Sequence, residues 1–268
     1  MKTRAITGFF FVGVMLASVL LGAYAFTLFF LILSLLCTDE FYRLVTKDDV
    51  KPQKRWGLAL AISIYLPLSL HFFKGEPLVY LLISVPLVVL VIVAELYRKH
   101  ENPFHNIAYT LFGVLFATVP FCFFYALAFT DGMYSSHYPL AFLILLWASD
   151  TGAYIFGINI GKHKLFERHS PKKTWEGFIG GMLCSFLAAF VLSRYFNELP
   201  LLEWLGMAAI IVIAGTFGDL SESMLKRSLS TKDSGSLLPG HGGLLDRFDG
   251  LLLAAPLVFV YLQFVSAF

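Results

Sequence analysis

Long runs of apolar residues, separated by short polar segments, dominate the pattern along the chain. An α-helix needs about 20 residues to cross the hydrocarbon layer of a membrane. Measured against that length, the runs predict an all-α fold, a polytopic membrane bundle of about nine transmembrane helices. These are expected near residues 6–22, 23–45, 56–73, 77–94, 107–130, 139–160, 177–195, 201–226 and 243–267.

The first two segments lie in one apolar run that is too long for a single crossing. We place the break at Gly22-Ala23; one long tilted helix, which would give eight segments, is the alternative. Pro67, Pro86 and Pro120 fall inside predicted segments, where proline should kink a helix without ending it. The basic N-terminus is expected to precede a retained segment, because no small-residue cleavage site interrupts the apolar run.

Charged residues gather on one side of this topology. With nine segments, all of the 20 lysines and arginines except Lys74 and Arg194 fall on the side of the N-terminus. Positive residues mark the cytoplasmic side, so we expect that side to be cytoplasmic. All but four of the 18 acidic residues fall there too. The positive-inside rule does not require this, and the pattern indicates a working site on that face.

Composition adds limits on the class of protein. The chain is 58% hydrophobic and 14% charged, with a net charge of +2, and we expect no nucleic-acid partner. Cys37, Cys122 and Cys184 lie singly in apolar runs, without metal-ligand spacing. We divide the chain into residues 1–138, an N-terminal region of about five segments, and residues 139–268, a catalytic region of about four.

Two aspartates are expected at similar depth on consecutive segments. Asp219 lies late in the eighth segment, and Asp246 lies about one turn into the ninth, which enters from the same side. Two carboxylates with open coordination positions suit Mg²⁺ that is shared with substrate phosphates. The alternative is ion pairing, of Asp219 with Lys226 and of Asp246 with Lys226 or Arg227. The pair of aspartates beside flexible glycines favours the metal site.

Gly240-His241-Gly242-Gly243 opens the ninth segment. Glycine permits close approach of the backbone to a ligand, and a helix N-terminus attracts phosphate. A simple turn would need only one glycine, so three glycines around a histidine favour a phosphate pocket. His241 could donate to a phosphate or act as an acid or base, and the sequence does not choose.

A second polar group lies in and after the sixth segment. Asp150 falls about halfway through the segment, where a carboxylate needs a partner or a water-filled cavity; it either binds substrate or holds two helices together. The next loop contains Ser-Pro-Lys-Lys-Thr-Trp-Glu-Gly, residues 170–177. Its lysines could attract anionic lipid, and Ser170 or Thr174 could cap a helix. The ordered mixture of residue types favours a clamp for a phosphate or nucleotide.

The stretch from Ser223 to Asp249 follows the pattern Ser-x-x-Lys-Arg-x₄-Lys-Asp-x-Gly-x₂-Leu-Pro-x-His-Gly-Gly-x-x-Asp-Arg-x-Asp. This pattern resembles the signature of the CDP-diacylglycerol synthases, also called phosphatidate cytidylyltransferases, without a departure. Ser-Asp-Thr-Gly-Ala-Tyr, residues 149–154, and the loop at 170–177 are also similar to that family. The resemblance covers about residues 145–250, and the N-terminal half is similar only in its hydrophobicity.

The resemblance implies that CTP and phosphatidate react to give CDP-diacylglycerol and pyrophosphate, with Mg²⁺ as cofactor, in phospholipid biosynthesis. Carried onto this chain, it makes Asp219 and Asp246 the metal ligands. The other residues expected at the site are Lys226, Arg227, Lys232 and Arg247 on the phosphates, His241, Gly242 and Gly243 in the phosphate pocket, Lys172, Lys173 and Thr174 over CTP, Asp150 as a candidate for substrate binding, and Asp249 and Asp233 orienting the cations.

Two alternatives remain. A CTP-dependent kinase of a lipid alcohol would transfer the γ-phosphoryl group and release CDP. A secondary transporter would use Asp150 and Asp219 as ion sites, but it would be expected to show an inverted repeat, and none is visible. We expect an integral protein of the inner (cytoplasmic) membrane whose site faces the cytoplasm. Its expected partners are CTP, phosphatidate and membrane lipids; a homodimer is compatible with the sequence, which does not decide the oligomeric state.

Overall fold

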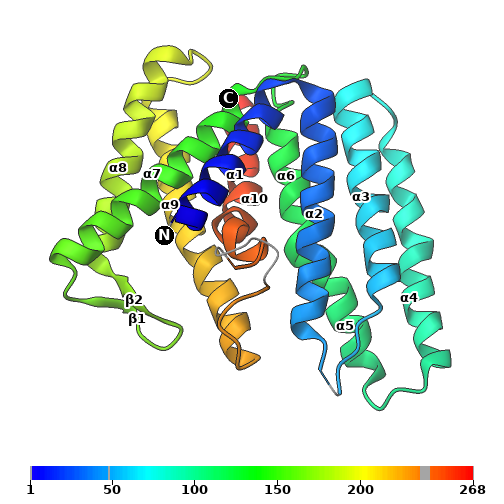
Figure 1. The fold of residues 1–268 in the computed structure, drawn as a ribbon. Coiled ribbons are helices and arrows are strands. Elements are labelled where there is room, and N and C mark those ends of the chain that lie inside the picture. Colours follow the sequence, from blue (N-terminus) through cyan, green and yellow to red (C-terminus); the bar gives the residue numbers. More distant parts are fainter. Residues whose placement is uncertain (1, 48, 236–241, 268) are drawn as a thin grey trace. The chain divides into compact units, whose positions relative to one another are not determined.

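Helices make up most of the structure, a computed structural model that describes residues 2–47, 49–235 and 242–267 (Figure 1). Eight helical segments in the described residues are long and apolar enough to cross a membrane, and a shorter apolar helix, Gly8–Leu20, precedes them. The chain is therefore an integral membrane protein, and the predicted all-α class is confirmed. The helices are α1 (Lys2–Leu20), α2 (Ala23–Val45), α3 (Lys54–Lys74), η1 (Leu78–Ile83), α4 (Ser84–Arg98), α5 (Pro103–Gly113), η2 (Val114–Thr118), α6 (Val119–Leu127), α7 (His137–Ile160), α8 (Trp175–Tyr195), α9 (Leu201–Ser228) and α10 (Leu245–Ala267).

The first apolar run is broken at the expected place. Helix α1 ends at Leu20, and α2 begins at Ala23. Between them, Gly22 has a φ of 99°, which a residue with a Cβ adopts only with strain. The sequence expectation of two helices, and not one long tilted helix, is confirmed.

Two of the three prolines inside predicted segments follow a change in helix type. Pro67 lies within α3, while Pro86 follows the change from the 3₁₀ turn η1 to α4, and Pro120 follows the π-helical segment η2. Proline has no backbone N–H and crowds the preceding turn. A locally wider or tighter turn accommodates this crowding without ending the crossing.

The chain folds as two compact units. The first unit contains Met1–Tyr134 and Asp233–Arg247, and the second contains Ser135–Lys232 and Phe248–Phe268. Residues of α10 therefore belong to both. The expected division at residue 138 concerns which region carries the activity, and it stays a prediction.

In the first unit, α3 packs against α2 and against α4 (Figure 1). The ring of Tyr42 in α2 occupies the space beside Gly57 of α3 and Gly113 of α5, and a Cβ at either glycine would collide with it. The Tyr42 hydroxyl donates to the carbonyl of Thr110 at 2.6 Å. Close approach of these helices thus depends on the two glycines and on a tyrosine whose buried hydroxyl is hydrogen-bonded.

A buried carboxylate joins three helices of the first unit. Glu95 of α4 is 3% exposed and accepts hydrogen bonds from Gln53 at the start of α3 (2.5 Å) and from Asn106 of α5 (2.6 Å). Arg98 supplies a cation at 2.8 Å. A buried carboxylate is costly unless it is paired and hydrogen-bonded, and these partners meet that requirement.

In the second unit, α7 and α8 approach closely through small residues. A Cβ on Gly152 of α7 would meet the carbonyl oxygen of Gly180 at 2.7 Å, and one on Gly181 would meet that of Ser149 at 2.8 Å. Small residues at such interfaces let helix backbones approach inside a membrane. This packing brings the Asp150 region of α7 against α8.

A short antiparallel hairpin links α7 to α8. Its strands are β1 (Lys164–Phe166) and β2 (Ser170–Thr174), paired at Lys164–Thr174 and Phe166–Ser170. Thr174 is the N-cap of α8, and its hydroxyl accepts the N–H of Gly177 at 3.1 Å. The cap predicted at Thr174 is confirmed, whereas the hairpin before it was not expected.

Candidate active site

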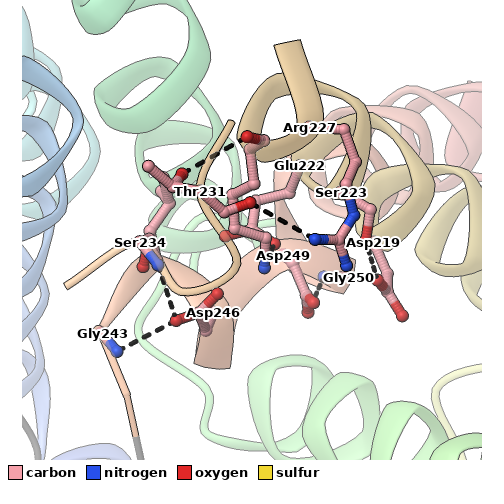
Figure 2. Close-up of polar contacts among 12 residues, drawn as sticks. Asp219, Glu222, Ser223, Arg227, Thr231, Ser234, Gly243, Asp246, Asp249 and Gly250 are labelled. Carbon is pink, nitrogen blue, oxygen red and sulfur yellow. Dashed lines mark hydrogen bonds and ion pairs between the residues drawn. The ribbon is translucent and has the colours of Figure 1, made fainter. Parts of the chain in front are cut away.

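Lys173 and Asp219 form the central contact of the second unit. The Lys173 ammonium on β2 lies 2.6 Å from an oxygen of Asp219 on α9 and 3.5 Å from the carbonyl of Thr216. The Ser223 hydroxyl, one turn along α9, donates to the other Asp219 oxygen at 3.2 Å (Figure 2). The ion pair proposed for Asp219 with Lys226 is therefore wrong, because the partner comes from the hairpin and not from the same helix.

Two further aspartates stand near this pair. The carboxylate of Asp249, on α10, lies within electrostatic range of Asp219, Asp150 and Lys173. It also accepts the N–H of Gly250 at 2.7 Å (Figure 2). Three carboxylates from α7, α9 and α10 thus share one neighbourhood with a lysine of β2. Carboxylate oxygens are the type of ligand that a hard cation such as Mg²⁺ takes.

Glycines explain why α9 and α10 come so close here. A Cβ on Gly218, the residue before Asp219, would collide with the backbone carbonyl of Asp249. One turn earlier, Gly215 lies against Gly250, with the Cβ position 3.8 Å from the Gly250 Cα. The spacing of Gly215 and Gly218 at i and i+3 places both on one helix face. That spacing was the sequence signal that could have brought Asp249 beside Asp219.

The predicted cations at the end of α9 have different surroundings. Lys226 pairs with Glu222 at 2.5 Å, and the Glu222 side chain is fully buried. Arg227 is exposed and donates to the carbonyl of Thr231 at 3.4 Å. Lys232 is also exposed. Lys226 is thus held by a buried acid, while the neighbouring cations reach toward solvent.

The two lysines of β2 differ in their exposure to solvent, because they are consecutive residues of a strand. Successive side chains of a strand point to opposite faces. Lys173 turns inward to Asp219, while Lys172 is exposed. Of the two lysines expected over CTP, the structure brings Lys173 to the carboxylates and leaves Lys172 on the surface of the hairpin.

In the first unit, Asp246 closes a loop. One of its oxygens accepts the N–H groups of Ser234 at 3.1 Å and Gly243 at 3.0 Å (Figure 2). Gly242 has a φ of 83°, so the glycine predicted here is required by the backbone. Arg247, next in α10, is exposed. Gly240 and His241 lie outside the described residues.

Sequence reasoning missed one residue that bonds to this segment from another helix. Glu40 of α2 is 6% exposed and accepts backbone N–H groups of Leu244 at 2.9 Å and Leu245 at 3.1 Å. The signal was visible, since an acid inside a predicted membrane segment usually has a role. Its proximity to the loop was not visible, because about 200 residues separate them.

The donor chemistry of the site fits the expected metal. Among the described residues no group of three or more His, Cys, Asp and Glu side chains is arranged to enclose a metal ion. Mg²⁺, however, takes one or two carboxylates and completes its shell with waters and substrate phosphates. The hard oxygens of Asp219, Asp150 and Asp249 match that preference. Asp246 belongs to the other unit, and its pairing with Asp219 on one metal stays a prediction.

Comparison with known proteins extends the likeness to the whole chain. The model of the cytidylyltransferase family matches residues 2–265. The phosphatidate cytidylyltransferase of Staphylococcus haemolyticus (strain JCSC1435) is 35% identical over 264 residues, which cover 98% of this chain and 99% of that protein. The phosphatidate cytidylyltransferases of Staphylococcus aureus (strain COL) and Staphylococcus epidermidis (strain ATCC 12228 / FDA PCI 1200) are also 35% identical, over 265 and 266 residues and with the same coverage. The similarity therefore includes the N-terminal segments, beyond residues 145–250.

Proposed function

The chain belongs to the cytidylyltransferase family, and from this premise we propose that it joins CTP to phosphatidate, forming CDP-diacylglycerol and pyrophosphate. Family membership makes it an enzyme, a nucleotidyltransferase. The names of the relatives, which match almost the full chain, support phosphatidate as the acceptor. The observation that carries the proposal is the group formed by Asp219, Lys173, Asp249 and Asp150. Its carboxylates would bind a metal that carries the CTP phosphates, and its lysine would contact those phosphates directly.

The proposed reaction is an in-line phosphoryl substitution. An oxygen of the phosphatidate phosphate forms a bond to the α-phosphorus of CTP, and the bond from that phosphorus to the bridging oxygen of the β-phosphate breaks. Pyrophosphate leaves with the electron pair. A phosphate monoester has a second pKa near 6, so the attacking group is already mostly ionised and needs no strong general base. The protein contributes mainly positioning and charge neutralisation.

The second unit supplies the charged groups for this task. Asp219 would be one metal ligand, and Lys173, held against it at 2.6 Å, would meet the CTP phosphates when they enter. Asp249 and Asp150 would complete the negative side of the site. Mg²⁺ bound there would neutralise the triphosphate and polarise its oxygens. The remaining cations proposed to neutralise phosphate charge are Lys172, Lys226, Arg227 and Lys232.

The first unit supplies the start of α10. The family pattern assigns Gly242 and Gly243 to the phosphate pocket at this end, where the N–H groups of Leu244 and Leu245 already bond to Glu40. By the family pattern, Asp246 would be the second metal ligand and Arg247 a further cation; His241, also assigned to the phosphate pocket, lies outside the described residues. This assignment rests on the family pattern from Ser223 to Asp249.

We place the site on the cytoplasmic face of the inner membrane. The clustering of 18 of the 20 lysines and arginines on one side, which leaves only Lys74 and Arg194 opposite, supports this orientation. CTP is soluble and would reach the site from the cytoplasm, while phosphatidate would come from the bilayer.

The decisive experiment is a product analysis with purified full-length protein. Labelled CTP should enter a lipid product only when phosphatidate and Mg²⁺ are both present, with pyrophosphate released in equal amount. Replacement of phosphatidate by diacylglycerol or a polyprenol should give no labelled lipid. Release of CDP together with a phosphorylated lipid alcohol would overturn the proposal in favour of a kinase.

A further inference from the structure

Glu40 is a buried acid that bonds to a distant loop of the first unit. It lies near the end of α2, and both of its oxygens accept hydrogen bonds. Oε2 accepts the N–H of Leu244 at 2.9 Å, and Oε1 accepts the N–H of Leu245 at 3.1 Å. The hydroxyl of Ser234 also donates to Oε1. Since all these donors are themselves buried, loss of the carboxylate would leave them without water to replace it.

Two glycines, one on each side of residues 236–241, pack against this carboxylate. A Cβ on Gly243 would collide with Glu40 Oε1 and with the Ser234 hydroxyl. A Cβ on Gly235 would lie 2.9 Å from the Glu40 Cδ and 3.0 Å from Oε2, closer than ordinary contact. Glycine is therefore needed on both sides of the carboxylate. Two of the glycines in the Ser223–Asp249 pattern have a packing reason that the pattern alone does not reveal.

The bonds to Leu244 and Leu245 amount to a helix cap from another part of the chain. The first N–H groups of a helix have no partner within it, and a negative charge near them is favourable. The usual cap comes from an adjacent residue. Here the carboxylate is 204 residues away from Leu244, so it caps α10 and also ties its start to α2.

Glu40 and Asp246 together join the two ends of the loop. Glu40 bonds to Ser234 and to Leu244 and Leu245, while Asp246 accepts the N–H groups of Ser234 and Gly243. Ser234 is bonded by both acids. The position of Asp246 at the start of α10 therefore depends on the carboxylate that caps the same helix end.

We infer that Glu40 is a positioning residue for the reaction, one that fixes the first turn of α10 and, through it, Asp246. This inference rests on the proposed function, in which Asp246 binds the metal. Glu40 reaches substrate only through the loop, so it is not a catalytic residue. Its effect should appear in the geometry of the α10 start and in the metal requirement.

The test compares Glu40→Gln and Glu40→Asp with Asp39→Asn in the full-length protein. Glutamine keeps the size of Glu40 but presents an NH₂ group to an N–H donor, while aspartate keeps the charge on a shorter side chain. Asp39 is the matched control, because it is the adjacent acid and pairs instead with Arg43 and Lys54. Two measurements are made: amide hydrogen exchange of peptides that contain Leu244 and Leu245, without metal or nucleotide, and the Mg²⁺ concentration for half-maximal activity.

For Glu40→Gln we expect exchange at Leu244 and Leu245 to become at least about tenfold faster, because a hydrogen bond to a charged group is lost. The Mg²⁺ requirement should rise roughly 10- to 100-fold, the usual effect of removing a group that orients a metal ligand. Glu40→Asp should restore part of both, and Asp39→Asn should match the wild type. Unchanged exchange and Mg²⁺ requirement in Glu40→Gln would overturn the inference.

Gly235→Ala gives a second test that does not depend on the folding of the Glu40→Gln variant. In the wild type, the added methyl should displace the Glu40 carboxylate and speed exchange at Leu244 and Leu245. In a Glu40→Ala background it should have little further effect, since the space is then empty. Equal effects in the two backgrounds would contradict the inference. An inactive wild-type protein would instead count against the proposed function, whereas the exchange data would still judge the role of Glu40.

Discussion

The ammonium of Lys173 lies 2.6 Å from a carboxylate oxygen of Asp219, which joins the hairpin before α8 to the helix α9. The contact places a long, flexible lysine side chain against the residue proposed to bind the metal. Phosphate or metal that enters the site must compete with one partner of this pair. Substitution of either residue is therefore expected to change the charge and the surroundings of the other.

Lys173→Met should lower kcat/KM for CTP by about 10- to 100-fold, because a charge-assisted contact of about 1.5–3 kcal/mol is removed. Methionine keeps the length of the side chain without its charge. Lys164→Met is the matched control, since Lys164 is exposed on the other strand of the same hairpin. Steady-state kinetics with varied CTP checks this. Equal losses in both variants would show that only the overall charge of the hairpin matters.

Asp219→Asn should reduce turnover by at least about 100-fold, the scale on which a preorganised electrostatic group acts at a reacting centre. Ser223→Ala should have a smaller effect, because it removes only one hydrogen bond to Asp219. Initial rates at saturating substrates measure this, with thermal unfolding in detergent as the check on the fold. Near-normal turnover of Asp219→Asn would exclude Asp219 as a metal ligand.

Removal of divalent ions with a chelator should abolish labelled lipid formation, and Mg²⁺ should restore it. Ca²⁺ should restore little, because it prefers longer bonds and more oxygen ligands than Mg²⁺. Activity is followed while each ion is titrated into chelated protein. Full activity in excess chelator would remove the metal from the proposed mechanism.

Gly218→Ala should lower stability by about 1–3 kcal/mol through overpacking and should lower activity as well. The new methyl would collide with the backbone of Asp249, where α9 and α10 approach. Gly13→Ala is the control, because nothing lies within 4 Å of a Cβ at that helical position; it should be neutral or stabilising. Unfolding curves and turnover of both variants decide this, and equal behaviour would contradict the close packing.

Asn106→Ala should destabilise the protein by about 1–3 kcal/mol, since it leaves buried partners without hydrogen bonds. Asn106 donates to Glu95 at 2.6 Å and accepts the N–H of Lys51 at 2.6 Å. The exposed Asn159 provides the control variant, Asn159→Ala. Thermal unfolding should separate the two, while the KM for CTP should stay unchanged in both. A raised KM for CTP in Asn106→Ala would give this network a role beyond stability.

The membrane helices could be predicted closely because their signal is local. A crossing helix must satisfy its own backbone and present apolar side chains, so run length alone located each segment. The break at Gly22 and the cap at Thr174 followed from the same short-range chemistry. The hairpin was missed because two strands of three and five residues leave little trace in a loop of lysines.

Partners across the chain could not be predicted in the same way. Helical spacing suggested Lys226 for Asp219, yet Lys226 pairs with Glu222 one turn before it, and Asp219 pairs with Lys173. Both choices are electrostatically reasonable in the sequence. Which one forms depends on where the hairpin lies against α9, and that is a property of packing.

The sequence by itself determined the apolar helices, the segments that carry charge and the family pattern from Ser223 to Asp249, because each depends on residues close together in the chain. The tertiary structure decided that Lys173 meets Asp219, that Asp249 and Asp150 share its surroundings, and that Glu40 caps α10. Those relationships depend on close approach between helices, which the small residues Gly218 and Gly243 permit. Side chains that are distant in the sequence come into contact only when their helices pack closely.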